Sequence, residues 1–468
     1  MHYTIHTMTK HQRIVLLLSL TLVFFLATPT LILYSQGYRI DWKAKRITQV
    51  GAFYLKITPS RVNVFVDGKL EDTTSLISDI SVVENLIPQR YAIQVSKDGY
   101  HPWKKTLEIH PKHITSAKNI LLIPSEIKTR TLASRVQKFW IAPHGREAIL
   151  QKMNSEGEWK LTKWDLEKHS EYKVFEPKTR KENLWNLQWS PSGDAILLEI
   201  NAGETIHRSI TQFNSKTSYD LEFLGRQGDE IRFLPGTKDT ILFIQHLPTS
   251  SILMEANYTT KSAVPVGLGN VVTFALEDNE ILWLDTKGFI WRKKMGFNSS
   301  SSALNTQPFP VHSETKYEIL LLNKRVFLKE NEKVFQLNDG TKNFQETSSS
   351  ALYVSLSPDE KKIAFSDGSE IWISYLENQN EQPQRKKGEK VFLTRVSQPI
   401  ENVSWLDSHH LLFSVGDTIK VAEIDDRDTI NIVDVLQMPK PQFFWQPENK
   451  IFYILSEGKF SVSEKLIR

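Results

Sequence analysis

The sequence contains no cysteine among its 468 residues. This absence excludes disulfides, thiolate metal sites and cysteine nucleophiles together, and it is compatible with either redox compartment. The formal net charge is only +4, and no run of Lys and Arg alternates with aromatic residues. We therefore expect no nucleic-acid partner. The stability of the folded chain must come from packing.

The common catalytic motifs are also missing. The sequence has no Gly-x-Ser-x-Gly nucleophile elbow, no His-Glu-x-x-His zinc motif and no Gly-rich Walker loop. Each of these motifs places reactive groups on a defined turn or helix, so their absence speaks against the corresponding enzymes. We predict a protein that is not an enzyme, with no catalytic, cofactor-binding or metal-binding residues and no cofactor.

Three polar groups could suggest a site, and each has a simpler interpretation. His101, His110 and His113 could bind a metal, but no carboxylate is placed in the sequence to complete the site. The acidic stretch Asp425–Asp428 lacks the Gly and the distal Glu of a calcium loop. The pair His409–His410 follows a turn and is expected to be solvated at a hairpin tip.

One long apolar segment stands near the N-terminus. Residues 14–34 carry no charge, and about 20 apolar residues suffice to cross a bilayer. We predict a transmembrane helix over 14–34 after a short cytosolic tail, residues 1–13, with Pro29 near its distal end. The alternative is a cleaved signal peptide, but Ala27-Thr28-Pro29 is followed by more apolar residues and offers no convincing cleavage site.

The charges that flank this helix do not favour the orientation we expect. Lys10 and Arg13 precede it, whereas four Lys and Arg residues follow it between positions 39 and 46, against the positive-inside rule. A short tail before the first apolar segment is nevertheless how secreted and anchored chains begin. We expect a single-pass protein of the plasma membrane with most of its chain outside the cytoplasm, and the lipid bilayer as its partner through residues 14–34.

A small β-domain is predicted over residues 38–124. Apolar and polar residues alternate along four stretches, which is typical of half-buried strands: 53–57, 62–66, 91–95 and 103–109. The second stretch ends at Asp67-Gly68 and the third at Lys97-Asp98-Gly99, both of which are turn sequences.

The turns and strands of this region resemble the PEGA domain, a small β-sandwich of bacterial and archaeal surface proteins. The resemblance covers most of 38–124 and depends on Pro59, the hairpin 62–68, Leu86-Ile87-Pro88, Tyr91 and Ser96-Lys97-Asp98-Gly99-Tyr100. The eponymous Pro-Glu-Gly-Ala is here Pro-Ser-Arg-Val at 59–62, and Gln89 stands where Gly is usual. Gly37-Tyr38 also resembles anchored family members, which implies a β-domain outside the cell.

The remaining chain, 127–468, repeats one unit. An aromatic or apolar anchor, a Pro/Gly/Asp turn and paired strands recur about every 40 to 50 residues, as in propeller blades. The copies lie at 139–145, 187–197, 231–236, 271–291, 318–337, 354–365, 403–407 and 443–447. The Ser-Pro turns resemble TolB-like and WD-repeat-like β-propellers. The fold class is therefore all-β, with about eight blades, or seven if the unit near Glu318 is not a separate blade.

Several residues have expected places in such a propeller. Trp189, Trp405 and Trp445 should pack between neighbouring blades, and the strand-like stretch 127–132 could complete the sheet of the last blade. Four further tryptophans fall outside the anchor, and they could be exposed or buried: Trp159, Trp164, Trp283 and Trp291. Residues 298–305 and 377–390 are rich in polar residues, so both are interpreted as solvated loops.

These features predict a membrane-anchored extracytoplasmic binding or scaffold protein of the bacterial cell envelope. The propeller would present an interaction surface to an envelope protein or a cell-wall glycan. The alternative is an envelope hydrolase or lyase with its site in the propeller channel, although no carboxylate pair can be placed there from sequence. A sensor is a third hypothesis, but the short tail leaves no room for a cytosolic output domain.

Overall fold

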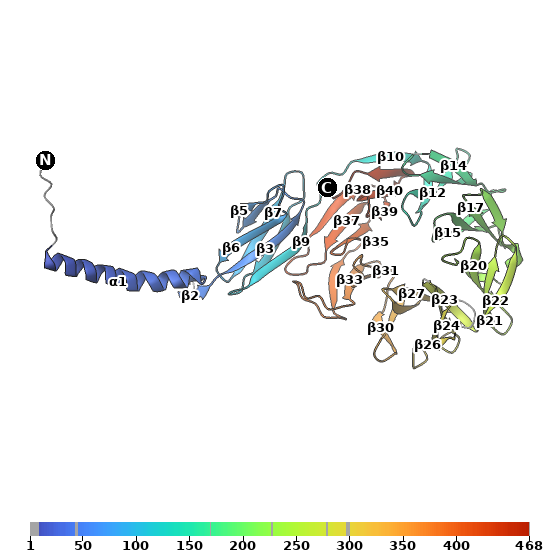
Figure 1. The fold of residues 1–468 in the computed structure, drawn as a ribbon. Coiled ribbons are helices and arrows are strands. Elements are labelled where there is room, and N and C mark those ends of the chain that lie inside the picture. Colours follow the sequence, from blue (N-terminus) through green and yellow to red (C-terminus); the bar gives the residue numbers. More distant parts are fainter. Residues whose placement is uncertain are drawn as a thin grey trace.

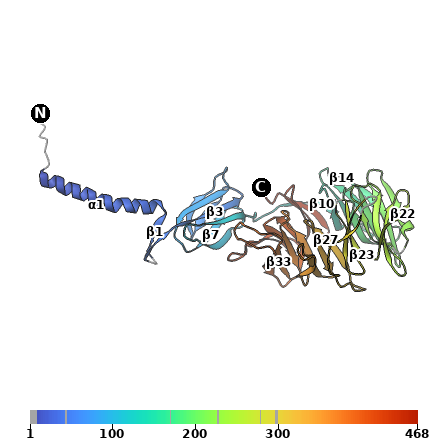
Figure 2. The ribbon, with the colours of Figure 1, turned by 60° about the horizontal axis from the view of Figure 1, so that its bottom comes forward.

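The protein consists of a helix, a small β-sandwich and a ring of β-sheets (Figure 1). The computed structural model describes residues 9–42, 45–168, 170–225, 228–277, 279–295 and 300–467. In both views the sandwich lies between the helix and the ring (Figure 2). The order in space is thus the order in sequence.

Helix α1 spans Lys10–Ser35. Thr9 and Gln12 cap its start by reciprocal hydrogen bonds, the capping-box arrangement. The helix continues through Pro29, and the neighbouring Thr30 hydroxyl donates to the carbonyl of Leu26 at 2.7 Å. Its 26 residues are about 39 Å long, which exceeds the roughly 30 Å of a hydrocarbon core. By length and composition α1 is long and apolar enough to span a membrane, and none of its residues is buried in the protein.

A β-hairpin directly follows the helix and is joined to it. Strands β1 (Tyr38–Asp41) and β2 (Arg46–Gln49) pair with each other in a sheet of their own. The Arg39 guanidinium lies 3.6 Å from the centre of the Tyr34 ring and donates to the Tyr34 carbonyl at 2.9 Å. It also donates to the Asn85 side chain of the sandwich at 2.8 Å. We call this set of contacts the Arg39 latch.

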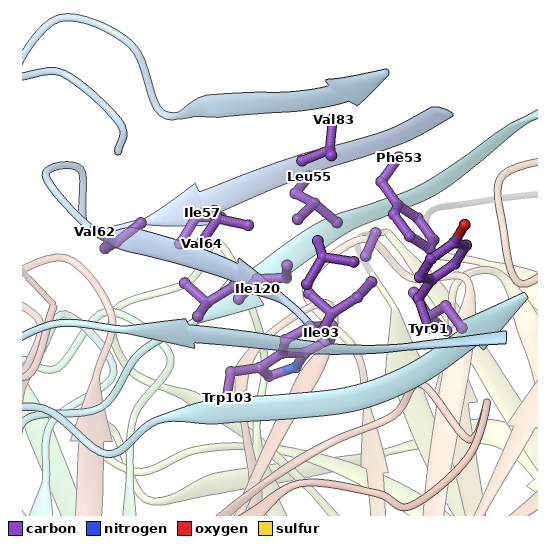
Figure 3. Packing of buried hydrophobic residues seen from close by; sticks show 14 of the residues in the cluster. Phe53, Leu55, Ile57, Val62, Val64, Val83, Tyr91, Ile93, Trp103 and Ile120 are labelled. Atoms are coloured by element: carbon purple, nitrogen blue, oxygen red, sulfur yellow. The ribbon is translucent and has the colours of Figure 1, made fainter. Parts of the chain in front are cut away.

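The sandwich packs two sheets face to face. The first contains β5 (Lys69–Thr73), β4 (Asn63–Val66), β7 (Arg90–Ser96) and β8 (Trp103–Glu108); the second contains β6 (Ile80–Leu86), β3 (Gly51–Thr58) and β9 (Ile114–Leu121). In β3 the side chains of Phe53, Leu55 and Ile57 are fully buried and alternate with more exposed neighbours. They meet Ile93 and Trp103 of the facing sheet (Figure 3). The predicted alternation is confirmed.

Eight four-stranded antiparallel sheets follow within the described residues. The first four are β11 (Val136–Ile141), β12 (Glu147–Met153), β13 (Trp159–Asp165), β14 (Ser170–Phe175); β15 (Asn183–Trp189), β16 (Ala195–Asn201), β17 (Ile206–Gln212), β18 (Thr217–Asp220); β19 (Gly228–Phe233), β20 (Thr240–His246), β21 (Ser251–Asn257), β22 (Ser262–Gly269); and β23 (Val271–Glu277), β24 (Glu280–Asp285), β25 (Ile290–Lys294), β26 (Ser302–Ala303). A single 3-10 turn, η1 (Glu222–Leu224), follows β18 in the described part of the ring.

The other four sheets complete the ring. They are β27 (Tyr317–Leu322), β28 (Arg325–Glu330), β29 (Lys333–Leu337), β30 (Phe344–Ser348); β31 (Tyr353–Leu356), β32 (Lys362–Ser366), β33 (Glu370–Tyr375), β34 (Lys390–Arg395); β35 (Ile400–Asp407), β36 (His410–Val415), β37 (Thr418–Glu423), β38 (Ile432–Gln437); and β39 (Gln442–Gln446), β40 (Ile451–Ser456), β41 (Lys459–Ser463), to which β10 (Thr129–Ser134) adds the fourth strand.

Strand β10 closes the ring. It precedes every other strand of the ring in sequence, yet it pairs with β41, as the stretch 127–132 suggested. A separate apolar cluster lies between each pair of consecutive sheets. A further cluster joins Leu150 of β12 to Phe460 of β41, that is, the first sheet to the last. A closed ring of four-stranded sheets is the architecture of a β-propeller.

The predicted packing of three tryptophans between sheets is confirmed. Each indole N–H donates to a carbonyl on the first strand of the preceding sheet: Trp189 to Trp140 at 3.2 Å, Trp405 to Ser355 at 3.0 Å, and Trp445 to Leu406 at 3.1 Å. Each of these tryptophans therefore supplies apolar surface and one hydrogen bond between two neighbouring sheets of the ring.

The two Ser-Pro turns are built alike. The hydroxyl oxygens of Ser190 and Ser357 accept hydrogen bonds from the backbone N–H five residues later, at 3.0 Å in both turns. The same hydroxyls donate to Asp194 at 2.8 Å and to Asp359 at 2.6 Å. The motif thus satisfies its own buried polar groups, which is the reason that this turn chemistry recurs.

The structure also settles the remaining aromatic and loop predictions. Trp159, Trp164 and Trp283 are buried, and Trp291 is half-buried and stacks on Trp283. In the segment 298–305, residues 298 and 299 lie outside the described residues, while Asn305 is buried. The Asn305 amide donates to the carbonyl of Gly288 and accepts from the N–H of Ile290. Solvation of this end of the loop was therefore a wrong prediction.

Trp445→Phe should lower the free energy of unfolding by about 1–2 kcal/mol, because it removes one buried hydrogen bond and leaves the Leu406 carbonyl without that donor. Chemical unfolding followed by far-UV circular dichroism measures the change. Trp372→Phe is the matched control, since Trp372 is exposed and its hydrogen bond to Glu370 lies within one strand, β33. An equal loss in both variants would contradict the role of the inter-sheet bond.

Candidate functional site

The sandwich and the propeller meet along two strand edges. Strands β8 and β9 are the last strands of their sheets, so each leaves backbone N–H and C=O groups without a neighbouring strand. The Asn431 amide accepts from the N–H of Lys104 at 3.3 Å and donates to its carbonyl at 3.0 Å. The Gln382 amide accepts from the N–H of Ser116 at 2.8 Å and donates to the carbonyl of Ile114 at 3.1 Å. Two propeller side chains therefore act on these edges as a neighbouring strand would.

A buried ion pair lies beside the Asn431 contact. The Lys105 side chain is fully buried, and its ammonium is 2.7 Å from one carboxylate oxygen of Glu423. It also donates to the carbonyl of Asp425 at 2.5 Å. The Trp103 indole N–H donates to the other oxygen of Glu423 at 2.8 Å. Both oxygens of the carboxylate are thereby paired, which a charge in this position requires.

The acidic stretch 425–428 belongs to the same junction. Asp428 accepts a hydrogen bond from the backbone N–H of Thr106 at 2.7 Å, and Asp426 pairs with Arg385. Asp425 pairs with Arg427 at 2.5 Å. Burial alone would raise the pKa of Asp425, but Arg427 and the nearby Lys105 hold it below its usual value. Asp428 and, at 3.8 Å from the Lys105 ammonium, Asp425 reach the sandwich, whereas Asp426 joins two loops of the propeller.

The prediction that His409 and His410 are solvated was wrong. His410 is 5% exposed, and its Nδ1 lies 2.9 Å from each oxygen of Asp407. Burial would lower the pKa of His410, but the Asp407 carboxylate outweighs it, so the pKa is raised. His409 is half-buried, and its burial together with Lys362 lowers its pKa. His101 and Trp103 of the sandwich line a small cavity together with His410, a proximity that the local sequence does not show.

A cleft of about 610 Å³ opens between the sandwich and this hairpin. Its sandwich wall carries Lys56 and Lys118, and its propeller wall carries His409 and Lys450. Lys118 pairs with Glu381 at 2.9 Å across the entrance. Segment 377–390 is an inter-strand loop with no buried residue, as predicted, and it also supplies Glu381 and the Gln382 amide to the junction. The cleft is polar and open to solvent.

The other candidate histidines lie elsewhere in the sandwich. His110 and His113 are exposed, with their ring centres 6.5 Å apart, and the His110 ring is 3.9 Å from Glu108. The Nε2 atom of His101 is buried near the junction and has no hydrogen-bond partner. Over the ranges that the structure describes, no three His, Asp or Glu side chains are grouped to hold a metal ion.

Sequence reasoning missed the junction residues, although one signal was present. Along β8 the inward-facing positions are Trp103, Lys105 and Leu107. A charged lysine side chain at such an inward-facing position is stable only if a carboxylate pairs with it. Gln382 and Asn431 gave no comparable signal, since amides are ordinary in polar loops.

Comparisons with known proteins match this chain to solved structures alone. No protein-family model and no curated protein matches the sequence. Similar solved structures include the β-propeller domain of Myceliophteria thermophila Cps50 (Swd1), with 9% identity, coverage of 73% of this chain and 99% of that chain, and a TM-score of 0.36. Sqt1 of Saccharomyces cerevisiae has 12% identity, 73% and 98% coverage, and a TM-score of 0.44. The computationally designed Ika8 protein has 12% identity, coverage of 72% of this chain and 97% of that chain, and a TM-score of 0.45. The resemblance of 38–124 to the PEGA domain stays a prediction.

Lys105→Met should destabilise the folded protein by about 3–5 kcal/mol, because it leaves the Glu423 carboxylate buried beside an apolar group. Lys104→Met on the same strand is the control, since Lys104 is exposed. Thermal unfolding measures both. The double variant Lys105→Met/Glu423→Gln should recover part of the loss, and no recovery would contradict the assignment of the cost to the unpaired carboxylate.

The pair of Asp407 and His410 should make stability depend on pH. Because the folded state raises the pKa of His410, protonation of this residue stabilises the folded protein. This stabilisation is complete below the ordinary pKa of 6.5 and is lost as the pH rises through the higher pKa of the folded state. Burial opposes a lower pKa of Asp407, but His410 outweighs it, so the pKa of Asp407 is lowered in the folded state. Ionised Asp407 therefore stabilises the folded protein, and this stabilisation is lost as the pH falls below the ordinary pKa of 3.8. Glu423 also acts on His410, and His409 acts on Asp407.

The free energy of unfolding that His410→Gln removes should therefore be largest between these two values and decline at alkaline pH. Urea unfolding of both proteins, from below pH 3.8 to alkaline pH, measures the difference. A difference that keeps growing as the pH rises above 6.5 would contradict a protonated His410 in the folded state.

Proposed function

We propose that this chain is a membrane-anchored binding or scaffold protein of the bacterial cell envelope. Helix α1 crosses the plasma membrane once, and the sandwich and propeller lie outside the cytoplasm. The eight sheets act as eight blades of one propeller, and the sandwich is a PEGA-like stalk. The propeller presents a rigid surface, to which the cleft beside His409 belongs, to an envelope protein or a cell-wall glycan.

One observation carries this proposal: directed contacts join each part of the chain to the next. The Arg39 latch ties the end of α1 to the sandwich. The linker from sandwich to propeller is itself packed, since Ile123 is 2% exposed and lies in a cluster with Leu406 and Leu412 of the propeller. The Asn431, Gln382 and Lys105 contacts then fix the junction. A surface that is held at a set distance and angle from a bilayer is what a scaffold requires.

The side of the membrane can be tested with the cysteine-free chain as background. Ile77→Cys places one thiol on a side chain that is 97% exposed, and Thr7→Cys places one in the tail before α1. We expect a membrane-impermeant maleimide, added to intact protoplasts, to label position 77 and to leave position 7 unlabelled until the membrane is opened with detergent. The reverse pattern would overturn the proposed orientation.

Membrane anchoring is tested separately by alkaline extraction. The full chain should stay with the membrane pellet, whereas Leu22→Arg/Phe25→Arg should shift it toward the soluble fraction, because each Arg near the centre of a span costs about 2.5–3.5 kcal/mol. Leu22→Ala/Phe25→Ala is the control for the altered shape. Release of the unaltered chain by the same treatment would refute the anchor.

A further inference from the structure

The hairpin β1–β2 has one apolar face that nothing in the described structure covers. Ile40 and Ile47 are directly opposite each other on the two strands, and they are 49% and 63% exposed. Trp42, at the end of β1, is 80% exposed. Asp41 points to the opposite face and is buried. We call Ile40, Trp42 and Ile47 the hairpin face.

Two residues alone, Gln36 and Gly37, separate this hairpin from the end of α1. The Arg39 latch also holds the first strand against the last turn of the helix, at Tyr34. If α1 spans a bilayer, the hairpin face must therefore lie at the level of the lipid headgroups. Large exposed apolar groups are unfavourable in water but favourable at that level, where tryptophan is enriched.

The hairpin also carries positive charge beside its apolar face. Lys45 and Arg46 are exposed, and the closest carboxylate contact of Arg46, to Asp41, is long, at 3.8 Å. Basic residues within a few ångströms of a membrane attract acidic lipids. This also gives a physical use to the Lys and Arg residues that follow α1 and that oppose the positive-inside rule.

We propose that the hairpin face inserts into the headgroup layer of the leaflet in which α1 ends, and that Lys45 and Arg46 bind the headgroups of acidic phospholipids there. The inference rests on the proposed function in one respect, that α1 spans the membrane. It assigns the hairpin a role as a second, interfacial contact, which together with the latch fixes the tilt of the sandwich on the bilayer.

The test uses single-cysteine variants of the full chain in vesicles. Ile47→Cys reports on the hairpin face, and Ile77→Cys is the control. The loop that carries Ile77 is hydrogen-bonded to the far end of β3, where the Asp79 carbonyl accepts from the N–H of Ile57. This end of β3 is about 20 Å from the start of the strand, which lies beside the hairpin. Each thiol is labelled with an environment-sensitive fluorophore. Lipids brominated near the top of the acyl chain serve as quenchers, in phosphatidylcholine with phosphatidylglycerol or in phosphatidylcholine alone.

We expect blue-shifted emission and quenching at position 47 in the acidic vesicles, and neither change at position 77. Lys45→Gln and Arg46→Gln, each made in the Ile47→Cys chain, should shift the docked equilibrium about fivefold apiece toward the undocked state. High salt should act in the same direction.

Three results would overturn the proposal, and they can be told apart. Water-like emission at position 47 from protein that resists alkaline extraction would refute the interfacial hairpin and leave the anchor standing. Equal quenching in acidic and neutral vesicles would refute the binding of acidic headgroups. Release of the protein from both vesicles by alkali would refute the span of α1, and the proposed function with it.

Discussion

The pairing of β10 with β41 is the interaction on which the rest of this structure depends. It completes the last sheet with the strand that leads directly into the first, and an apolar cluster fills the space between these two sheets, so that each sheet of the described ring has two neighbours. It also fixes the start of the propeller next to the linker, where Ile123 is buried against β35 and β36. The loops of Gln382 and Asn431 belong to adjacent sheets, and they can reach both edges of the sandwich only while those sheets keep their places.

The junction between the two β-domains is polar because it covers strand edges. An apolar surface would leave the outward N–H and C=O groups of β8 and β9 unpaired, at a cost that burial of carbon does not offset. The Asn431 and Gln382 amides and the Asp428 carboxylate pair with these groups. Together with the Lys105 ion pair they also select one orientation, since hydrogen bonds and charges tolerate less displacement than apolar contacts. Buried charge is weak support for stability, but here it has a second use, in specificity of docking.

The sequence predicts the fold far better than it predicts the site. Strand alternation and Ser-Pro turns are local patterns that recur from unit to unit. A wrong assignment in one unit therefore leaves the prediction of the other units and of the fold unchanged. The site is made from residues about 320 positions apart, as in the bond from Trp103 to Glu423. No local pattern reports such a pairing. His410 was misplaced for the same reason, while Lys105, a charge on the inward face of a strand, was the one residue whose neighbours already required a distant partner.

The order of synthesis gives the closing strand a further consequence. Strand β10 leaves the ribosome long before β41, which lies about 330 positions later, as the bond between Ser461 and Thr131 shows. Closing a loop of that length costs on the order of 5 kcal/mol in chain entropy. Until it closes, the nascent ring exposes unpaired strand edges that can join to other chains. If α1 spans a membrane, as proposed, neighbouring copies of the chain are concentrated in two dimensions while that edge is open, which makes such joining faster.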